Sequence, residues 1–151
     1  MKRNISIAVI GIMISVAVIA AHHENEVVKP SKISQSDVSG DIYNRSNMVK
    51  TTHKDGHTSL DVTTLVSSSG EYCTGMYQSE ETHMEVTEHW GVDEFFYIIE
   101  GSITLTSSDG TVMTVNSGEA ASIPEEWTGQ WDTEGYSKIW VVHSEDLSYC
   151  N

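Results

Sequence analysis

The stretch 94–131, EFFYIIEGSITLTSSDGTVMTVNSGEAASIPEEWTGQW, decides the fold expected for this chain. It consists of short runs rich in Val, Ile, Thr, Phe and Tyr, separated by turn residues. Ser108-Asp109-Gly110 and Asn116-Ser117-Gly118 have the composition of hairpin turns, in which glycine adopts a positive φ without strain. Short runs of this kind, with turn signals every 8–12 residues or so, are typical of an all-β sandwich or barrel.

The same pattern extends on both sides of this stretch, from about residue 58 to residue 143. No amphipathic helix is convincing there, which argues against a helical bundle. We therefore expect an all-β domain with strands at Leu60–Ser67, Tyr72–Gln78, His83–Glu88, Glu94–Glu100, Ser102–Ser107, Thr111–Val115, Ala120–Ile123, Gly129–Thr133 and Ser137–His143.

The strand that follows Asp93 has two apolar faces. Alternate residues of a strand share a face, so Glu94 lies with Phe96, while Phe95 lies with Tyr97. A barrel interior can bury one of these faces. The other must be covered by the N-terminal arm, a second sheet or a partner subunit, and the last of these would make the protein a homodimer.

Residues 1–20 have the features of a secretory signal peptide. Met1-Lys2-Arg3 is basic, residues 5–20 are apolar, and Ala20 is small enough to precede the cleavage site. An uncleaved membrane anchor is the alternative, but this run is shorter than the roughly 20 apolar residues that span a bilayer. We expect cleavage after Ala20, export to the periplasm or the exterior, and no stable membrane association afterwards.

The chain after the signal peptide divides into three parts. Residues 21–57 show no lasting period of 3.6 or 2, so we expect a flexible arm or linker with at most a short strand near its end. The β domain follows at 58–147, and a tail at 148–151. Cleavage after Ala20 would also expose Ala21-His22-His23, whose amine, amides and imidazole suit Cu(II) or Ni(II).

The charge of the chain restricts its partners. It has 22 Asp and Glu against 8 Lys and Arg, a formal net charge of −14. A surface of this sign repels nucleic acid and anionic membranes, so we expect neither as a partner. Attraction of cations is one interpretation of this charge, and we favour the other, a solvated acidic surface.

The two cysteines, Cys73 and Cys150, form an even pair in a chain expected to enter an oxidising compartment. A disulfide between them would join the end of the chain to an early strand. Two unpaired thiols are the alternative, because sequence alone does not fix the distance between the two Cα atoms.

Two spacings in the opening stretch resemble the motifs of the cupin superfamily. Glu94 is followed after six residues by Gly101, like the end of the first cupin motif, and Gly118 is followed after five residues by Pro124, like the start of the second. This resemblance implies a double-stranded β-helix, the cupin jelly-roll barrel. Fold alone does not specify function, since cupins host many activities.

A longer ordered set of segments resembles one cupin subfamily. That subfamily includes the (S)-ureidoglycine aminohydrolase cupin domain and the ethanolamine-utilisation cupin, and the matching segments are Gly75-Met76-Tyr77, Asp93-Glu94, Pro124–Trp131, Glu134 and Lys138.

The resemblance implies a metal site formed by His and Glu side chains, for which Mn, Fe, Ni or Zn are suitable ions. Glu94 occupies the Glu position, and Glu88, His89 and Gln130 are the other candidate ligands. Several expected histidines are replaced in this chain, at Thr87, Trp90 and Gly129. We therefore expect a degenerate or absent metal site, in which Glu94 makes a buried hydrogen bond.

Aromatic residues are numerous for a small barrel. They form either a ligand pocket or ordinary core packing, and the candidate pocket residues are Trp131, Trp127, Tyr77, Phe96 and Lys138. Glu94 is the candidate for proton transfer in any catalysis. We favour a module that binds a small polar molecule over a metal-dependent, aminohydrolase-like hydrolase or a structural protein.

Overall fold

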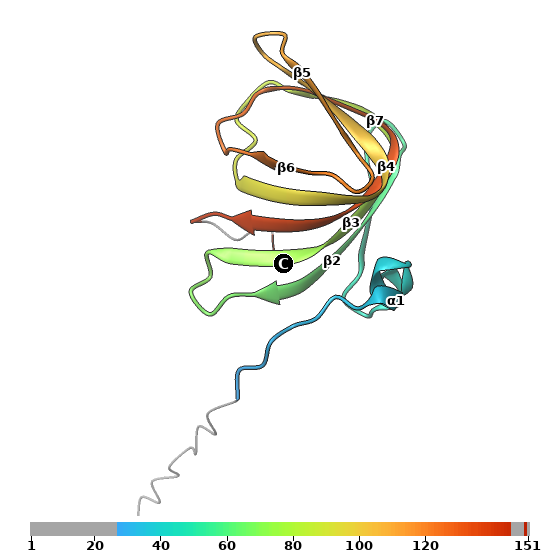
Figure 1. The fold of residues 1–151 in the computed structure, drawn as a ribbon, viewed down its shortest axis with the longest axis vertical. Coiled ribbons are helices and arrows are strands. Elements are labelled where there is room, and N and C mark those ends of the chain that lie inside the picture. The colour runs from blue at the N-terminus through green and yellow to red at the C-terminus, as the bar shows by residue number, and fades with distance from the viewer. Residues whose placement is uncertain (1–26, 146–149, 151) are drawn as a thin grey trace, which may run out of the picture.

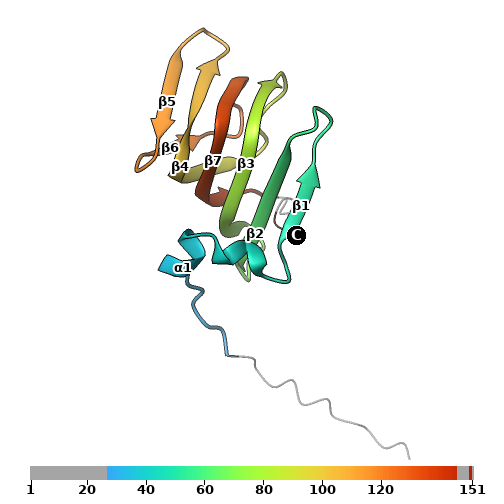
Figure 2. The same cartoon turned by 90° about the vertical axis from the view of Figure 1, so that its right-hand side faces the viewer.

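The chain forms one antiparallel sheet that curls into a barrel. The structure, a computed structural model, describes residues 27–145 and residue 150. Its sheet has seven strands in the order β1-β2-β3-β7-β4-β5, and β6 also pairs with β4 (Figures 1 and 2). The strands are β1 Val49–Thr52, β2 Thr58–Val66, β3 Tyr72–Val86, β4 Asp93–Ser107, β5 Val112–Asn116, β6 Ala120–Ile123 and β7 Gly129–His143.

Three long strands form the frame of this barrel. β3, β4 and β7 have 15 residues each, and β7 lies between the other two. The sequence predicted two shorter strands within each of them, and that prediction is wrong for all three. The all-β class and the cupin-type barrel are confirmed.

The long strands bend without ending. The pairing of β4 with β7 shifts its register between Ile98 and Glu100 and again between Gly101 and Thr104. Such bulges bend a strand and increase its twist while hydrogen bonding continues on both sides. The first half of β4 therefore pairs with β6 and its second half with β5.

The alternation predicted for the start of β4 is present. Glu94, Phe96 and Ile98 are buried on the inner face, whereas Phe95 and Tyr97 point outward. The sequence analysis expected a cover over the outer face as well. Among the described residues this cover is incomplete, because Phe95 and Tyr97 remain 47% and 41% exposed.

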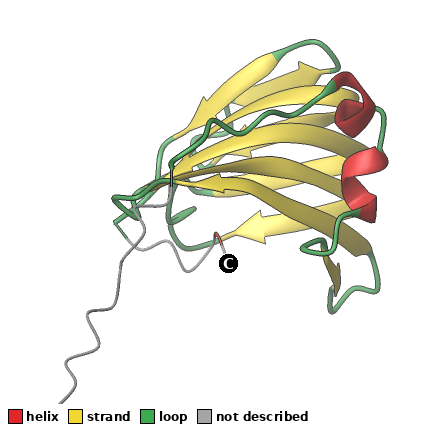
Figure 3. Cartoon of the chain, turned by 90° about the horizontal axis from the view of Figure 1, so that it is seen from below, coloured by secondary structure: helices red, strands yellow, loops and turns green. Residues whose placement is uncertain are grey.

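Part of the segment expected to be a flexible arm is folded: helices lie within residues 35–44, where none was expected, whereas the short strand expected near the end of the segment is present as β1. A short helix α1, Gln35–Val38, a 3-10 helix η1, Asp41–Asn44, and β1 lie there, with the helices on the outside of the sheet (Figures 1 and 3). Ile42 is fully buried against Val62 and Met76. This contact with β2 and β3 holds η1 in place.

Polar contacts fix the start of this segment. The Ser34 side chain accepts a hydrogen bond from the Asp37 backbone, and Asp37 accepts one from the Ser34 backbone, a capping box that begins α1. Arg45 then forms an ion pair with Asp37 at 2.8 Å. These local bonds stabilise helices too short to show a period in the sequence.

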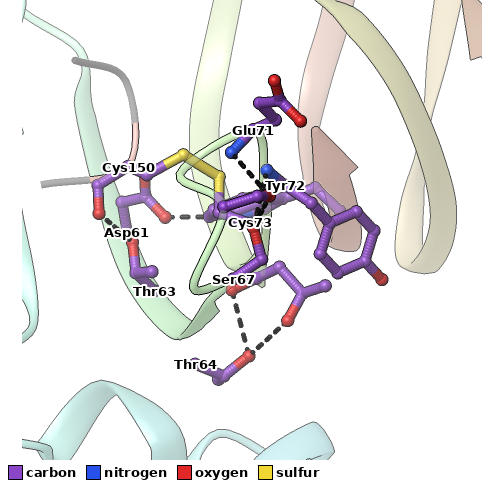
Figure 4. The surroundings of a disulfide bond; sticks show 11 residues. Asp61, Thr63, Thr64, Ser67, Glu71, Tyr72, Cys73 and Cys150 are labelled. Carbon is purple, nitrogen blue, oxygen red and sulfur yellow. Dashed lines mark hydrogen bonds between the residues drawn. A yellow bond between two sulfur atoms is a disulfide. The ribbon is translucent and has the colours of Figure 1, made fainter. Parts of the chain in front are cut away.

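The structure contains the disulfide that the sequence left open. Cys73 on β3 is bonded to Cys150, with 6.2 Å between the two Cα atoms (Figure 4). Thr63 Oγ1 donates a hydrogen bond to the Cys150 carbonyl at 3.2 Å. The bond therefore attaches residue 150 to the barrel beside β2.

Two expectations fall on residues that the structure does not describe. The signal peptide at 1–20 and the metal-binding N-terminus Ala21-His22-His23 lie outside the described residues. Between residue 27 and residue 145, and at residue 150, there is no helix with the length and apolarity needed to cross a membrane.

Candidate functional site

A cavity of about 380 Å³ lies in the barrel interior. Its walls come from the inner faces of β2, β3, β4 and β7, from the turn between β1 and β2, and from the loop that leads to β4. The side chains that line it are His53, His57, Asp61, Tyr77, Ser79, Thr82, Met84, Trp90, Val92, Glu94, Trp131, Tyr136, Lys138, Trp140 and Val142. Aromatic rings therefore supply much of its wall.

A buried ion pair lies in the wall of this cavity. Lys138 Nζ donates to Glu94 Oε1 at 2.5 Å, and both residues are only 6% exposed. Trp90 Nε1 donates to the other carboxylate oxygen of Glu94 at 3.2 Å. Each charge thus has a partner, which is the condition for keeping charged groups in an apolar interior.

Four aromatic rings surround the ammonium group of Lys138. Its Nζ lies 5.0 Å from the centre of the Trp131 ring and 5.1 Å from that of Phe96. Tyr77 and Tyr136 follow at 5.6 Å and 5.9 Å. A cation within about 6 Å of a ring is attracted by the ring's quadrupole, so the site already holds one organic cation among aromatic rings.

Asp61 is the second carboxylate in the cavity wall. Its Oδ1 accepts a hydrogen bond from Trp140 Nε1 at 3.1 Å. Burial raises the pKa of the Asp61 carboxyl, while this hydrogen bond and the charge of Lys138 act in the opposite direction. Burial also raises the pKa of Tyr77, and raises that of Tyr136 well above its ordinary value, so both phenols stay neutral.

The residues predicted to form a pocket divide into three groups. Trp131, Tyr77 and Lys138 line the cavity. Phe96 lies behind this lining and contacts Trp131 with 5.8 Å between the ring centres. Trp127 is not among the lining residues; its Nε1 donates to Ser107 Oγ at 3.1 Å, so its role is packing at the rim.

Trp90 belongs to the site, although the sequence presented it only as the replacement of a metal ligand. Its ring stacks on Trp131, with the centres 5.2 Å apart and the planes 6° apart. Together with its hydrogen bond to Glu94, this stacking makes Trp90 part of the cavity wall. The position of Trp90, four residues before Glu94 in the sequence, was the signal that could have assigned it to the site.

Two histidines at the cavity edge lie in the segment that the sequence analysis expected to be a flexible arm. The rings of His53 and His57 stack at 4.1 Å in nearly parallel planes. A hydrogen bond of 2.8 Å joins Ser59 Oγ to His53 Nε2, and a second hydrogen bond joins Asp55 to His57. The signal missed was Asp55-Gly56, a typical hairpin turn that joins β1 to β2.

The candidate metal ligands do not come together. Glu88 and His89 are exposed in the loop after β3, and Gln130 is exposed on β7. Within the described part of the chain, no three His, Cys, Asp or Glu side chains are grouped as metal ligands would be. Glu94 has the ammonium of Lys138 as its cation, so these residues do not fit a cupin metal site.

Comparison with known proteins agrees with this architecture. The family model described as the EutQ-like cupin domain matches residues 68–138. A search of curated proteins gives no match.

Two solved structures share the fold. The first is a protein of unknown function of the DUF861 family from Pseudomonas syringae pv. tomato str. DC3000, with a TM-score of 0.57 and 16% identity over 63% of this chain. This chain covers only 43% of that protein. The second is the Clostridium difficile EutQ protein, with a TM-score of 0.53 and 23% identity over 67% of this chain and 79% of that one.

The order of strands in the curled sheet and the family match at residues 68–138 lead to the same conclusion about the fold. This chain has a cupin-type jelly-roll barrel, and its residues 68–138 are similar to the EutQ-like cupin domain.

Proposed function

We propose that this chain is an exported cupin that binds a small polar organic molecule, with a flat or sugar-like ring, inside its barrel. The observation that carries the proposal is the aromatic cavity of about 380 Å³ with a buried Glu94–Lys138 pair in its wall. Ligand sites are typically concave, roughly 300–1,000 Å³ in volume, mostly apolar, and equipped with a few fixed polar groups.

The cavity supplies two kinds of contact to such a molecule. Trp90, Trp131 and Trp140 line the cavity, and aromatic contact favours a ligand with an apolar face. Asp61 and the Tyr77 hydroxyl supply hydrogen-bonding groups along one wall. Because these groups are held by the sheet, the site is largely formed before the ligand arrives.

A metal-dependent hydrolase of the aminohydrolase type is less well supported. The resemblance that suggested it depends on a ligand set of which only Glu94 lies in the cavity wall. Its carboxylate is bonded to Lys138 and Trp90. We therefore propose binding rather than catalysis as the function.

Export is supported by two independent features. Residues 1–20 have the composition of a signal peptide, and a disulfide joins Cys73 to Cys150. Disulfides persist in oxidising compartments and are rare in the cytosol. N-terminal sequencing of protein recovered outside the cytoplasm tests the expected cleavage after Ala20.

Ligand binding is tested with a pair of variants on neighbouring positions of β3. Met84 lines the cavity and lies opposite Trp131, whereas Glu85 is exposed and lies opposite Gln130. Ligand-observed NMR with a panel of monosaccharides, nucleobases, aromatic amines and aromatic acids identifies binders. Met84→Trp should occupy part of the cavity and abolish the binding of these molecules, whereas Glu85→Trp should leave their binding unchanged.

Two results would contradict the proposal. One is that no member of the panel binds the wild-type protein. The other is that Met84→Trp, shown to be folded by circular dichroism, binds the same molecules as strongly as the wild type does.

A further inference from the structure

Asp61 is a carboxylate in the cavity wall that lacks a cation of its own. The other acid in that wall, Glu94, is bonded to Lys138 at 2.5 Å. Asp61 takes part in none of the ion pairs formed among residues 27–145 and 150. With histidine counted as neutral, the cavity wall carries two carboxylates and one ammonium, and thus an excess of negative charge.

The surroundings of Asp61 hold its carboxylate in place. Trp140 Nε1 donates to Oδ1 at 3.1 Å, and Asp61 lies directly opposite Tyr77 in the pairing of β2 with β3. Trp140 and Tyr77 both line the cavity as well. A ligand atom that approaches Asp61 therefore meets a fixed acceptor between two aromatic side chains.

The cavity also shows that its walls accommodate an ammonium group. The Nζ of Lys138 lies within 6 Å of four ring centres, at distances of 5.0 to 5.9 Å. Aromatic faces next to a carboxylate are the arrangement by which proteins bind organic cations. Lys138 has this arrangement with Glu94, whereas Asp61 has the aromatic neighbours but forms no ion pair within residues 27–145 and 150.

We infer that the cavity selects a small organic cation, a ring-bearing amine or quaternary ammonium compound, whose charged nitrogen pairs with Asp61 and whose apolar body contacts the aromatic wall. This inference rests on the proposed function, since it requires that the cavity is a ligand site.

Anionic and neutral ligands fit the cavity less well than a cation does. An organic anion would face two carboxylates, and the ammonium of Lys138 is already bonded to Glu94. A neutral molecule would gain the aromatic contacts but would leave the charge of Asp61 uncompensated. The acidic chain as a whole, at −14, also favours the approach of cations over anions.

The test compares three probes of similar shape that differ in charge: 2-phenylethylammonium, 2-phenylethanol and phenylacetate. Isothermal titration at pH 8 and low salt measures their affinities for the wild-type chain. We expect the ammonium compound to bind about tenfold more tightly than the alcohol, and phenylacetate to bind most weakly.

Two variants then assign the preference to Asp61. In Asp61→Asn the side-chain oxygen still accepts from Trp140, but the charge is lost, so the affinity for the ammonium compound should fall to that for the alcohol. Near- and far-ultraviolet circular dichroism of Asp61→Asn verifies that this variant is folded and that the surroundings of the cavity tryptophans are intact. Asp132→Asn removes an equal charge outside the cavity, beside His83, and should leave all three affinities unchanged.

The outcomes separate this inference from the proposed function. Equal binding of the alcohol and the ammonium compound would overturn the selection of cations and leave ligand binding in place. A preference for the cation that persists in Asp61→Asn, or that is lost equally in Asp132→Asn, would overturn the role of Asp61. If neither these probes nor any member of the wider panel binds, both proposals are wrong.

Discussion

Lys138 and Glu94 depend on each other because both are buried. Removing an ion from water is costly, and mutual attraction offsets that cost only when the geometry is good and the remaining polar atoms are bonded. Here Glu94 has a bond to each oxygen, from Lys138 and from Trp90. The stability of the site is therefore a property of the pair.

The first prediction concerns the loss of one partner. Lys138→Met leaves Glu94 as an unpaired buried charge, and we expect the free energy of unfolding at pH 7 to fall by about 3–5 kcal/mol. The double variant with Glu94→Gln should lose less than the sum of the two single variants. Urea denaturation measures the free energy of unfolding of the single and double variants. A value for Lys138→Met within about 0.5 kcal/mol of the wild type would contradict the prediction.

Lys50→Met is the matched control for this experiment. Lys50 is an exposed lysine on β1. Removing its charge should change the free energy of unfolding by no more than about 0.5 kcal/mol.

The second prediction concerns pH. Because burial raises the pKa of Asp61 above 3.8, the folded state holds this proton more tightly than the unfolded chain does. Above the unfolded pKa the unfolded state binds fewer protons, so the contribution of Asp61 to stability falls as the pH rises through the folded pKa. Asparagine does not titrate. Asp61→Asn should therefore gain in melting temperature relative to the wild type between pH 3 and pH 8, and a constant difference across that range would contradict the assignment.

At the scale of the elements, bends in the long strands give the barrel its shape. The register of β4 against β7 shifts around Gly101, and Gly101 lies opposite Tyr136, next to Gly135. A Cβ added at Gly101 would lie 2.0 Å from the Gly135 carbonyl oxygen. The backbones of β4 and β7 are in close contact here, and only glycine at position 101 permits that approach.

The third prediction separates this contact from backbone conformation. Gly101 and Gly118 both have a positive φ, of 78° and 86°, but only Gly101 is crowded. Gly118→Ala should lower the free energy of unfolding by about 1–2 kcal/mol, from the strained backbone conformation alone. Gly101→Ala should cost about 3 kcal/mol or more, because the backbone of β7 must move. Thermal denaturation compares the two variants. Equal losses of stability in Gly101→Ala and Gly118→Ala would show that the contact of Gly101 with β7 is unimportant.

The sequence predicted where the strands lie better than it predicted which of them are continuous. Alternation and turn residues predicted every strand of the domain, but Gly101 and Gly135 were interpreted as strand ends. Glycine is equally suited to a turn and to a bend within a strand, so composition does not distinguish them. The fold of residues 35–52 depends on the burial of Ile42 against distant strands, which no local pattern records.

Part of the candidate site was also predictable. Trp131, Tyr77 and Lys138 were identified by resemblance, whereas Asp61 was missed. In the stretch Ser59–Thr63 the polar side chains alternate with Leu60 and Val62, which suggests a polar face in solvent. In the structure Asp61 lines the cavity, and Val62 is buried beneath η1 on the other face of the sheet. A polar side chain that faces a cavity inside the barrel follows the same alternation as one that faces solvent, so this pattern does not distinguish the two.

At the scale of the whole molecule, the disulfide joins distant parts of the chain. Cys73 and Cys150 are 77 residues apart, and the bond encloses β4, β5, β6 and β7. A crosslink of this span restricts the unfolded chain far more than the folded one.

The fourth prediction follows from this span. Reduction of the Cys73–Cys150 bond should lower the free energy of unfolding by about 4 kcal/mol in the chain-entropy model. Urea denaturation with and without a phosphine reductant measures the change, and mass spectrometry of alkylated protein verifies the number of free thiols. An unchanged midpoint in fully reduced protein would rule out a stabilising role.

The position of β7 in the sheet has a consequence for the order of events during synthesis. β3 and β4 do not pair with each other; both require β7, which is translated after every other strand. A nascent chain that has emerged only as far as residue 128 carries two long strands without their common neighbour. The barrel therefore cannot close on the ribosome until β7 has emerged, and a polypeptide that stays open until then remains accessible to the factors that handle unfolded chains.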